Sequence, residues 1–259
     1  FTDNNSYYFN YFWQPNKSTV LTKKMNAHII TIGDEILIGQ TLNTNAAYIG
    51  AQLSELNIFV AKSSVVADDE NEILEEFKTA LAQNDIVIAT GGLGPTHDDI
   101  TRACIVKFFK TELQMNNDVL DDIKNFLSKR GRVITKVNED QALVPTIAKV
   151  IRNKNGTAPG MWIESDGKIF IVMPGVPYEM KAMMTNFVLP ALKELNKKPK
   201  HFYKRKTLQT TGIGESVLFE KLGDINELIS GAKLAFLPSQ FGVKLRITAK
   251  EKTEELANN

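Results

Sequence analysis

The chain has 259 residues, of which 43% are hydrophobic and 24% charged, and its formal net charge is +1. This composition is that of a globular protein of one or two domains, and the small net charge excludes recruitment of nucleic acid or membrane by a global field. A single cysteine, Cys104, excludes an intrachain disulfide. No apolar run reaches the length of a membrane span, and the cytoplasm is the expected location.

Residues 1–24 differ in composition from the rest of the chain. They are rich in Asn, Tyr, Phe and Ser, and Met25 directly precedes the first strand-like pattern. We interpret this segment as a disordered leader or extension, with docking of its aromatic side chains on a surface as the alternative.

From His28 onward, short apolar runs alternate with amphipathic helical patterns. Strands are expected at 28–33, 58–65 and 85–90, with helices at 45–56 and 70–82 between them. Alternation of this kind predicts a three-layer α/β domain, in which a doubly wound, mostly parallel sheet lies between helices. We place this domain at residues 25–197.

The same domain continues with less regular patterns. Helices are expected at 100–110, 117–129 and 139–143, and a strand at 146–151. Ser165-Asp166-Gly167 predicts a hairpin between strands 161–164 and 168–173. A helix over 177–195 follows, which Pro190 should kink or shorten.

A polar segment broken by proline, residues 196–200, is interpreted as a domain boundary. Residues 198–259 are then expected to form a small α+β domain, with strands at 202–210, 233–237 and 243–249 and helices at 215–222 and 225–229. Since the sequence stops at Asn259 directly after a strand pattern, we expect this domain to be truncated. Basic residues near its start interleave with Phe202 and Tyr203, but a solvated linker explains that run better than a nucleic-acid site.

The strongest functional motif is Thr90-Gly91-Gly92-Leu93-Gly94-Pro95-Thr96-His97-Asp98-Asp99, between a buried strand and a helix. Glycines allow backbone amides to approach an anion closely, and the positive end of a helix dipole adds to the attraction. The alternative is a tight strand-to-helix turn in which Asp98 or Asp99 caps the helix. Carboxylates beside a phosphate repel it, and a divalent cation such as Mg²⁺ removes that conflict.

Two further motifs follow strands of the same sheet. Asp34 and Glu35 end the first strand, and Asn43 and Asn45 precede the next helix. The other motif is Met173-Pro174-Gly175-Val176-Pro177-Tyr178-Glu179-Met180. Because the carboxyl ends of parallel strands share one edge, these segments are expected to meet the glycine loop.

Together these motifs, with Gly156-Thr157-Ala158-Pro159-Gly160, resemble the CinA family (competence/damage-inducible protein A) from Met25 to about Lys250. The first domain resembles the molybdopterin-binding MoaB/MogA-like fold. The second is similar to a KH-type domain, but it has no Gly-x-x-Gly clamp. The resemblance implies a homodimer and metal-dependent hydrolysis of ADP-ribose to AMP and ribose 5-phosphate. The amidase domain of many family members is absent from this sequence.

On this interpretation each motif residue has an expected role. The catalytic residues are Asp99, Asp98, Glu35 and Glu179, and the metal ligands are Asp34 and Asp99. The ligand, a nucleotide-type small molecule, is expected to contact Gly91, Gly92, Gly94, Thr96, Asn43, Asn45, Pro174 and Gly175. Two alternatives stay open: a molybdopterin-binding adenylyltransferase, and a non-catalytic nucleotide-binding or regulatory module. Neither a membrane nor nucleic acid is expected as a partner.

Overall fold

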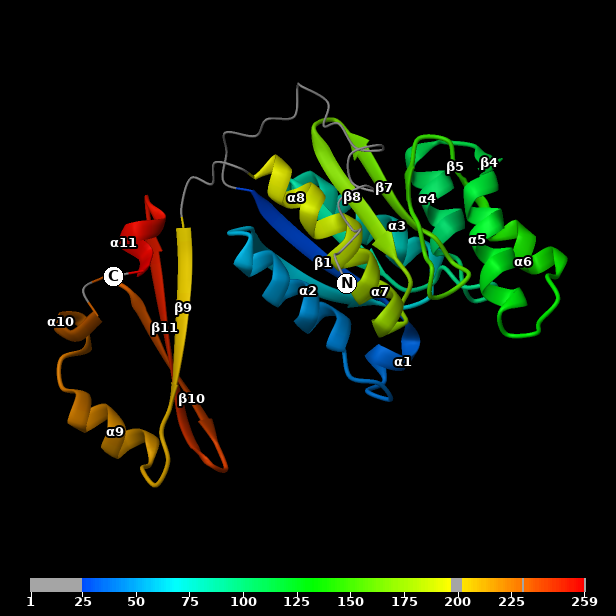
Figure 1. Cartoon of the computed structure of the whole chain (residues 1–259). Helices are drawn as coiled ribbons and strands as arrows, with labels where there is room; N and C mark the ends of the chain where they lie inside the picture. Colours follow the sequence, from blue (N-terminus) through cyan, green and yellow to red (C-terminus); the bar gives the residue numbers. More distant parts are fainter. Residues whose placement is uncertain (1–24, 197–201, 230, 259) are drawn as a thin grey trace, which may run out of the picture. The chain divides into compact units, whose positions relative to one another are not determined.

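The computed structural model of the protein describes residues 25–196, 202–229 and 231–258 (Figure 1). The leader expected at residues 1–24 and most of the boundary expected at 196–200 lie outside the described residues. The described residues form two compact units, the first containing residues 25–196 and the second residues 202–229 and 231–258.

The first unit is built on a six-stranded sheet with strand order β2-β1-β3-β8-β7-β6. The strands are β1 (Asn26–Ile32), β2 (Phe59–Val66), β3 (Ile86–Thr90), β6 (Lys149–Ile151), β7 (Gly160–Ser165) and β8 (Lys168–Met173). β2, β1, β3 and β8 run parallel, whereas β7 is antiparallel to both β8 and β6. The four parallel strands therefore end at the same edge of the sheet.

Helices cover both faces of this sheet (Figure 1). One face packs against α2 (Thr44–Glu55), α7 (Pro177–Met183) and α8 (Leu189–Leu195), and the other against α3 (Glu70–Gln83) and α4 (Thr101–Phe109). Successive strand residues alternate between the two cores, since β-strand side chains point to opposite faces. The predicted three-layer α/β fold is confirmed.

The helix expected at 177–195 is interrupted by a π-helical segment, η2 (Met184–Val188), between α7 and α8. Pro190 is the second residue of α8. Because proline has no amide hydrogen and its ring clashes with the carbonyl four residues earlier, the preceding turn cannot keep regular α-helical bonding. The predicted disturbance is therefore present on the N-terminal side of Pro190.

A small lobe follows α4. It contains α5 (Asn117–Ser128), α6 (Lys136–Asp140) and the antiparallel pair β4 (Leu113–Met115) and β5 (Leu143–Pro145). The short helix expected at 139–143 is wrong in position, because Thr135 and Asn138 form a capping box that starts α6 earlier. β4, β5 and the one-turn helix α1 (Asp34–Leu37) were not expected.

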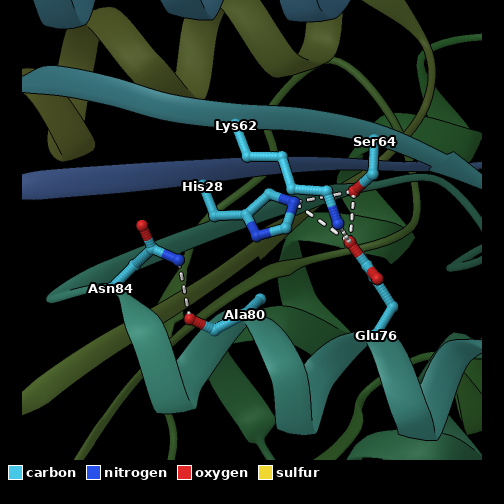
Figure 2. Close-up of polar contacts among 6 residues, drawn as sticks. All are labelled: His28, Lys62, Ser64, Glu76, Ala80 and Asn84. Carbon is cyan, nitrogen blue, oxygen red and sulfur yellow. Dashed lines mark hydrogen bonds and ion pairs between the residues drawn. The ribbon is translucent and has the colours of Figure 1, made fainter.

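A buried polar cluster ties α3 to the sheet (Figure 2). His28 of β1 is 1% exposed, and its Nε2 lies 2.8 Å from Ser64 Oγ of β2 and 3.0 Å from Glu76 Oε1 of α3. Ser64 donates a hydrogen bond to the same carboxylate at 2.6 Å. Burial lowers the pKa of His28 below its ordinary value, although the charge of Glu76 opposes that shift. The cluster therefore holds a neutral imidazole in a structural role.

The second unit contains a three-stranded antiparallel sheet of order β10-β11-β9. Its elements are β9 (Phe202–Gln209), α9 (Glu215–Leu222), α10 (Ile225–Ile229), β10 (Lys233–Ser239), β11 (Gly242–Glu251) and α11 (Glu254–Asn258). Leu218 of α9 packs on Val243 and Leu245 of β11. The expected small α+β domain is confirmed. The expectation that the sequence stops directly after a strand is wrong, because α11 follows β11.

Cys104 lies in the core between α4 and the sheet, and burial raises the pKa of its thiol to about 11. A thiol with that pKa is almost entirely protonated at neutral pH, and so it is a packing residue. Within the described part of the chain, no helix combines the length and the apolarity that crossing a bilayer requires.

The two-sided core gives a matched test of stability. Leu53 of α2 is fully buried, whereas Leu42, just before that helix, is 82% exposed. Leu53→Ala should lower the free energy of unfolding by about 2–5 kcal/mol, because it removes buried apolar contacts and leaves a cavity. Leu42→Ala should change it by less than about 0.5 kcal/mol. Urea denaturation followed by circular dichroism measures both, and equal losses would contradict the assigned core.

Candidate functional site

A pocket of about 480 Å³ lies at the carboxyl ends of the parallel strands. All four parallel strands are followed by segments that contribute to its lining. These residues are Gly33 and Glu35 after β1, Asp68 after β2, the segments Gly91–Pro95 and Asp98–Asp99 after β3, and Pro174, Gly175, Val176 and Glu179 after β8. Ile32, Gln141, Thr157 and Ala158 complete the lining. The volume is that of a small-molecule site.

The glycine loop after β3 requires glycine at two adjacent positions. Gly91 has φ +110°, and a Cβ there would lie 2.1 Å from the Ile32 carbonyl oxygen. Gly92 has φ +63°, and its Cβ would lie 2.1 Å from Thr101 Oγ1. Neither contact is possible for a real side chain. The amides of Gly92 and Leu93 donate to no acceptor among the described residues.

Asp99 holds this loop in shape. Its carboxylate accepts hydrogen bonds from the Gly94 amide at 2.7 Å, the Thr96 amide at 2.9 Å and the Thr96 hydroxyl at 2.5 Å. The helix that follows, α4, begins at Thr101 after Ile100, without a side-chain cap. Asp98 and Asp99 are therefore not helix caps. Both oxygens of Asp99 are engaged within the loop, while Thr96 is absent from the pocket lining.

Four other carboxylates line the pocket, Glu35, Asp68, Asp98 and Glu179, and the first three lie near one another. Burial raises the pKa of Asp68, and the negative charges of Asp34, Glu35 and Asp98 raise it further, against a backbone hydrogen bond from Asp34. Hydrogen bonding to Thr96 lowers the pKa of Asp98, which favours its ionised form. The first three carboxylates thus gather close enough to repel one another.

Asp34 is not part of the pocket lining, but it forms hydrogen bonds with Asp68, which is. Its amide donates to Asp68 Oδ2 at 3.2 Å, and the Asp68 amide donates to Asp34 Oδ1 at 3.3 Å. Asp34 therefore orients Asp68, which the sequence analysis missed. The sequence analysis selected residues that follow the carboxyl ends of other parallel strands. The same criterion applies to β2, because β2 ends at Val66, two residues before Asp68.

The carboxylates of the pocket could bind a metal ion only in part. Across the described residues, no three His, Cys, Asp or Glu side chains converge in a way that could hold one. Carboxylate oxygens are nevertheless the ligands that Mg²⁺ prefers, and Mg²⁺ commonly binds to one or two carboxylates together with substrate phosphates. Glu35, Asp68 and Asp98 fit that shared mode of binding, and they do not form a closed cage.

Glu179 occupies the other wall of the pocket, where it is 7% exposed. Asn153 Nδ2 donates to its Oε2 at 2.6 Å, and a Cβ at Gly156 would lie 2.2 Å from the same oxygen. Burial raises the pKa of Glu179, while hydrogen bonds from Asn153 and Tyr178 oppose the shift. A carboxyl group of this kind keeps its proton to a higher pH than an ordinary glutamate, which makes it a candidate for proton exchange with a bound water or ligand.

Asn43 and Asn45, two residues expected to bind substrate, bond to the backbone of the protein. Asn43 caps α2 by accepting from the Ala46 amide at 3.0 Å, and Asn45 donates to the Gly175 carbonyl at 2.6 Å. Neither belongs to the pocket lining, whereas Gly91, Gly92, Gly94, Pro174 and Gly175 do. His97, a further titratable residue of the loop, has a fully exposed side chain and also lies outside the lining.

Comparison with known proteins agrees with this architecture. Residues 28–194 match the family model described as "Probable molybdopterin binding domain", and residues 205–259 match "Damage-inducible protein CinA KH domain". A CinA-like protein of Cytophaga hutchinsonii is 44% identical over 86% of this chain. The chain belongs to the CinA family. This result confirms the resemblance found in the sequence, including the molybdopterin-binding type of fold in the first unit.

A second CinA-like protein, from Flavobacterium psychrophilum, is 42% identical over 91% of the chain. This chain covers 54% and 56% of these two relatives, so it spans little more than half of their length. The crystal structure of the protein CinA from Thermoplasma acidophilum is 39% identical, with a TM-score of 0.59, and it covers 65% of this chain and 99% of its own. That similarity supports the fold of the first unit within the CinA family.

Gln141 is a further pocket residue of this CinA-family chain that sequence reasoning missed. It is 2% exposed, and neither Oε1 nor Nε2 has a hydrogen-bond partner among the described residues. No glycine, charge or strand end marks this position in the sequence. Only the folded arrangement of the small lobe brings it to the pocket.

Two glycines with similar backbone conformations separate steric from torsional effects. Gly131 has φ +66° and open space around its Cβ position, whereas a Cβ at Gly92 meets Thr101. Gly131→Ala should destabilise the fold by roughly 1–2 kcal/mol because of its left-handed backbone. Gly92→Ala should cost a further 1–3 kcal/mol or so, because the loop must move to admit the methyl group. Urea denaturation measures both, and equal costs would contradict the close packing of this loop.

The buried Glu179 predicts a pH-dependent difference from Glu179→Gln. Because burial raises its pKa above the ordinary value of 4.5, the folded state binds more protons than the unfolded state between the two values. The free energy of unfolding of the wild type should therefore fall relative to that of Glu179→Gln as pH rises from 4.5 through the pKa of Glu179 in the folded protein. Above that pKa, the difference between the two proteins should stay constant. Each unit between the two pKa values corresponds to about 1.4 kcal/mol. Urea titrations from pH 4 to 8 test this, and a constant difference over that range would contradict the shift.

Proposed function

We propose that this chain hydrolyses a nucleotide pyrophosphate in a metal-dependent reaction, with ADP-ribose as substrate and AMP and ribose 5-phosphate as products. The observation that carries the proposal is the composition of one pocket. It combines the amides of Gly92 and Leu93, which lack acceptors, with the carboxylates of Glu35, Asp68 and Asp98. Amides attract phosphate and carboxylates repel it, so both are useful together only when a cation lies between.

In this proposal each part of the pocket has a separate task. The loop Gly91–Gly94 binds a phosphate of the substrate through backbone amides, and the walls set its position. One or two of the carboxylates of Glu35, Asp68 and Asp98 would hold the divalent ion together with phosphate oxygens of the substrate, and Asp34 orients Asp68. When bound, that ion neutralises charge on the phosphate oxygens and makes the phosphorus easier to attack.

The reaction itself is a displacement at phosphorus. A water oxygen forms a bond to one phosphorus atom, and the bond from that phosphorus to the bridging oxygen breaks. Glu179 accepts the proton of the attacking water, a task that suits a carboxyl group whose pKa burial has raised. The bridging oxygen leaves with the other phosphate, so the two products are phosphate monoesters. Asp99 takes no part beyond holding the loop.

A second candidate function is favoured by the family description of the first unit. A molybdopterin-binding domain would use the same phosphate loop for a pterin phosphate, and an adenylyltransferase would transfer AMP to it from ATP. A non-catalytic nucleotide-binding module would use only the binding part of the pocket. We also propose, on the family resemblance, assembly as a homodimer; a cytoplasmic location is proposed from the composition.

The test is hydrolysis of ADP-ribose by the purified chain with Mg²⁺, with AMP measured by liquid chromatography. We expect AMP release that a chelator abolishes, and a loss of about 100-fold in the double variant Glu35→Gln, Asp98→Asn, because metal ligands are removed without loss of volume. Glu75→Gln, at an exposed carboxylate of α3, is the matched control and should keep full activity.

Other outcomes would decide against the proposal. Saturable AMP binding without turnover would favour the binding module, and an adenylylated pterin formed from ATP would favour the second candidate. Full activity in the double variant would remove these carboxylates from the mechanism.

A further inference from the structure

The carboxamide of Gln141 is a feature of the pocket that hydrolysis of a pyrophosphate does not use. The residue is 2% exposed, and both its amide oxygen and its amide nitrogen lack partners among the described residues. A primary amide can donate two hydrogen bonds and accept two. Buried polar groups of proteins are almost always paired, so a buried amide with no protein partner in a pocket lining needs a partner from outside the chain.

The backbone around Gln141 is held from two sides. Arg102 of α4 donates to the Asp140 carbonyl at 2.6 Å and to the Leu143 carbonyl at 3.4 Å. On the other side, the Asn116 amide donates to the Ala142 carbonyl at 2.9 Å. These bonds fix the chain immediately before and after Gln141. The backbone of Gln141 is therefore held in place at the pocket by hydrogen bonds of its neighbours.

Phosphate cannot satisfy this group fully. A phosphate oxygen accepts hydrogen bonds, so it pairs with Nε2 and leaves Oε1 without a donor. A metal ion could pair with Oε1 but would leave Nε2 without an acceptor. A heterocycle edge with a donor beside an acceptor pairs with both atoms at once, as the amino group and ring nitrogen of adenine do with a glutamine or asparagine.

The two ends of a nucleotide thus find different chemistry in this pocket. The glycine loop and the carboxylates suit its phosphates, and Gln141 offers the donor and acceptor that these groups lack. A ligand with a complementary edge pairs with both amide atoms, whereas a ligand without such an edge leaves at least one of them unpaired.

We propose that Gln141 binds the adenine edge of the nucleotide and makes the site selective for its base. This assignment rests on the proposed function, because it takes the ligand to be an adenine nucleotide. It gives Gln141 a binding role at the base, separate from the phosphate chemistry at the other end of the ligand.

The experiment compares ligands with and without a base. Isothermal titration calorimetry with Mg²⁺ measures binding of AMP and of ribose 5-phosphate to the wild type, Gln141→Met and Gln114→Met. Methionine keeps the length of the side chain but removes both polar atoms. Gln114, exposed in β4, is the matched control.

We expect Gln141→Met to weaken AMP binding about tenfold or more, as loss of a bidentate base contact does, and to leave ribose 5-phosphate binding unchanged. Gln114→Met should match the wild type for both ligands. Thermal denaturation without ligand should show Gln141→Met to be no less stable than the wild type, because the lost amide makes no bond within the described protein.

The inference is overturned if Gln141→Met binds AMP as well as the wild type does, or if ribose 5-phosphate binding falls equally. It is also overturned if a pterin monophosphate binds and AMP does not, since the edge would then belong to another heterocycle. Wild-type AMP release from ADP-ribose is measured in parallel. Turnover with no effect of Gln141→Met refutes only the role of Gln141, whereas no turnover refutes the proposed hydrolysis.

Discussion

The site depends on a close approach of backbones where β1, β3 and β8 end. Gly91 lies so near the end of β1 that a Cβ would overlap the Ile32 carbonyl oxygen, and a Cβ on Gly175 would be in ordinary contact with the Gly91 Cα at 3.5 Å. Parallel strands bring their carboxyl ends to one edge, but side chains would normally hold the following loops apart. Glycine at position 91 allows these loops to pack backbone against backbone. The part of the lining formed by Gly91, Gly92 and Gly175, here called the pocket floor, therefore consists of peptide groups. Peptide groups suit an anion better than apolar side chains do.

Around that floor, polar residues divide into two groups. Asp99 and Asn45 form hydrogen bonds to neighbouring backbone, and this fixes the walls. Glu35, Asp68 and Asp98 also line the pocket, where burial raises the pKa of Asp68 and the negative charges of Asp34, Glu35 and Asp98 raise it further. Unrelieved repulsion of this kind destabilises a folded protein, so the arrangement makes physical sense when a cation or ligand relieves it. The cluster at His28 and Glu76 is different, since its groups pair with one another within the protein.

Much of this could be predicted from the sequence because it depends on local rules. Apolar runs and amphipathic periods located β1, β3, α3 and α9, and glycine-rich strand ends located the loop that forms the pocket floor. The parts that could not be predicted depend on contacts distant in sequence. Asp68 matters because Asp34, 34 residues earlier, bonds to it, and Gln141 reaches the pocket because Arg102 binds the backbone beside it. The role of Asp99 depends on where α4 begins, which sequence patterns fix only within a few residues.

The division of the pocket into a glycine loop with carboxylates and the separate residue Gln141 bears on how one fold can bind different ligands. Backbone amides and carboxylates with a cation recognise phosphate, which nucleotides and pterin phosphates share, so these groups cannot distinguish the two ligand classes. Discrimination requires a group that meets the part of the ligand that varies. In this chain the small lobe containing α6 and β5 brings such a group, Gln141, to a pocket floor built by the sheet. The lobe lies outside the parallel strands, whereas the glycine loop directly follows β3. On the proposed function, selectivity for the base and binding of phosphate would therefore be carried by different segments of the first unit.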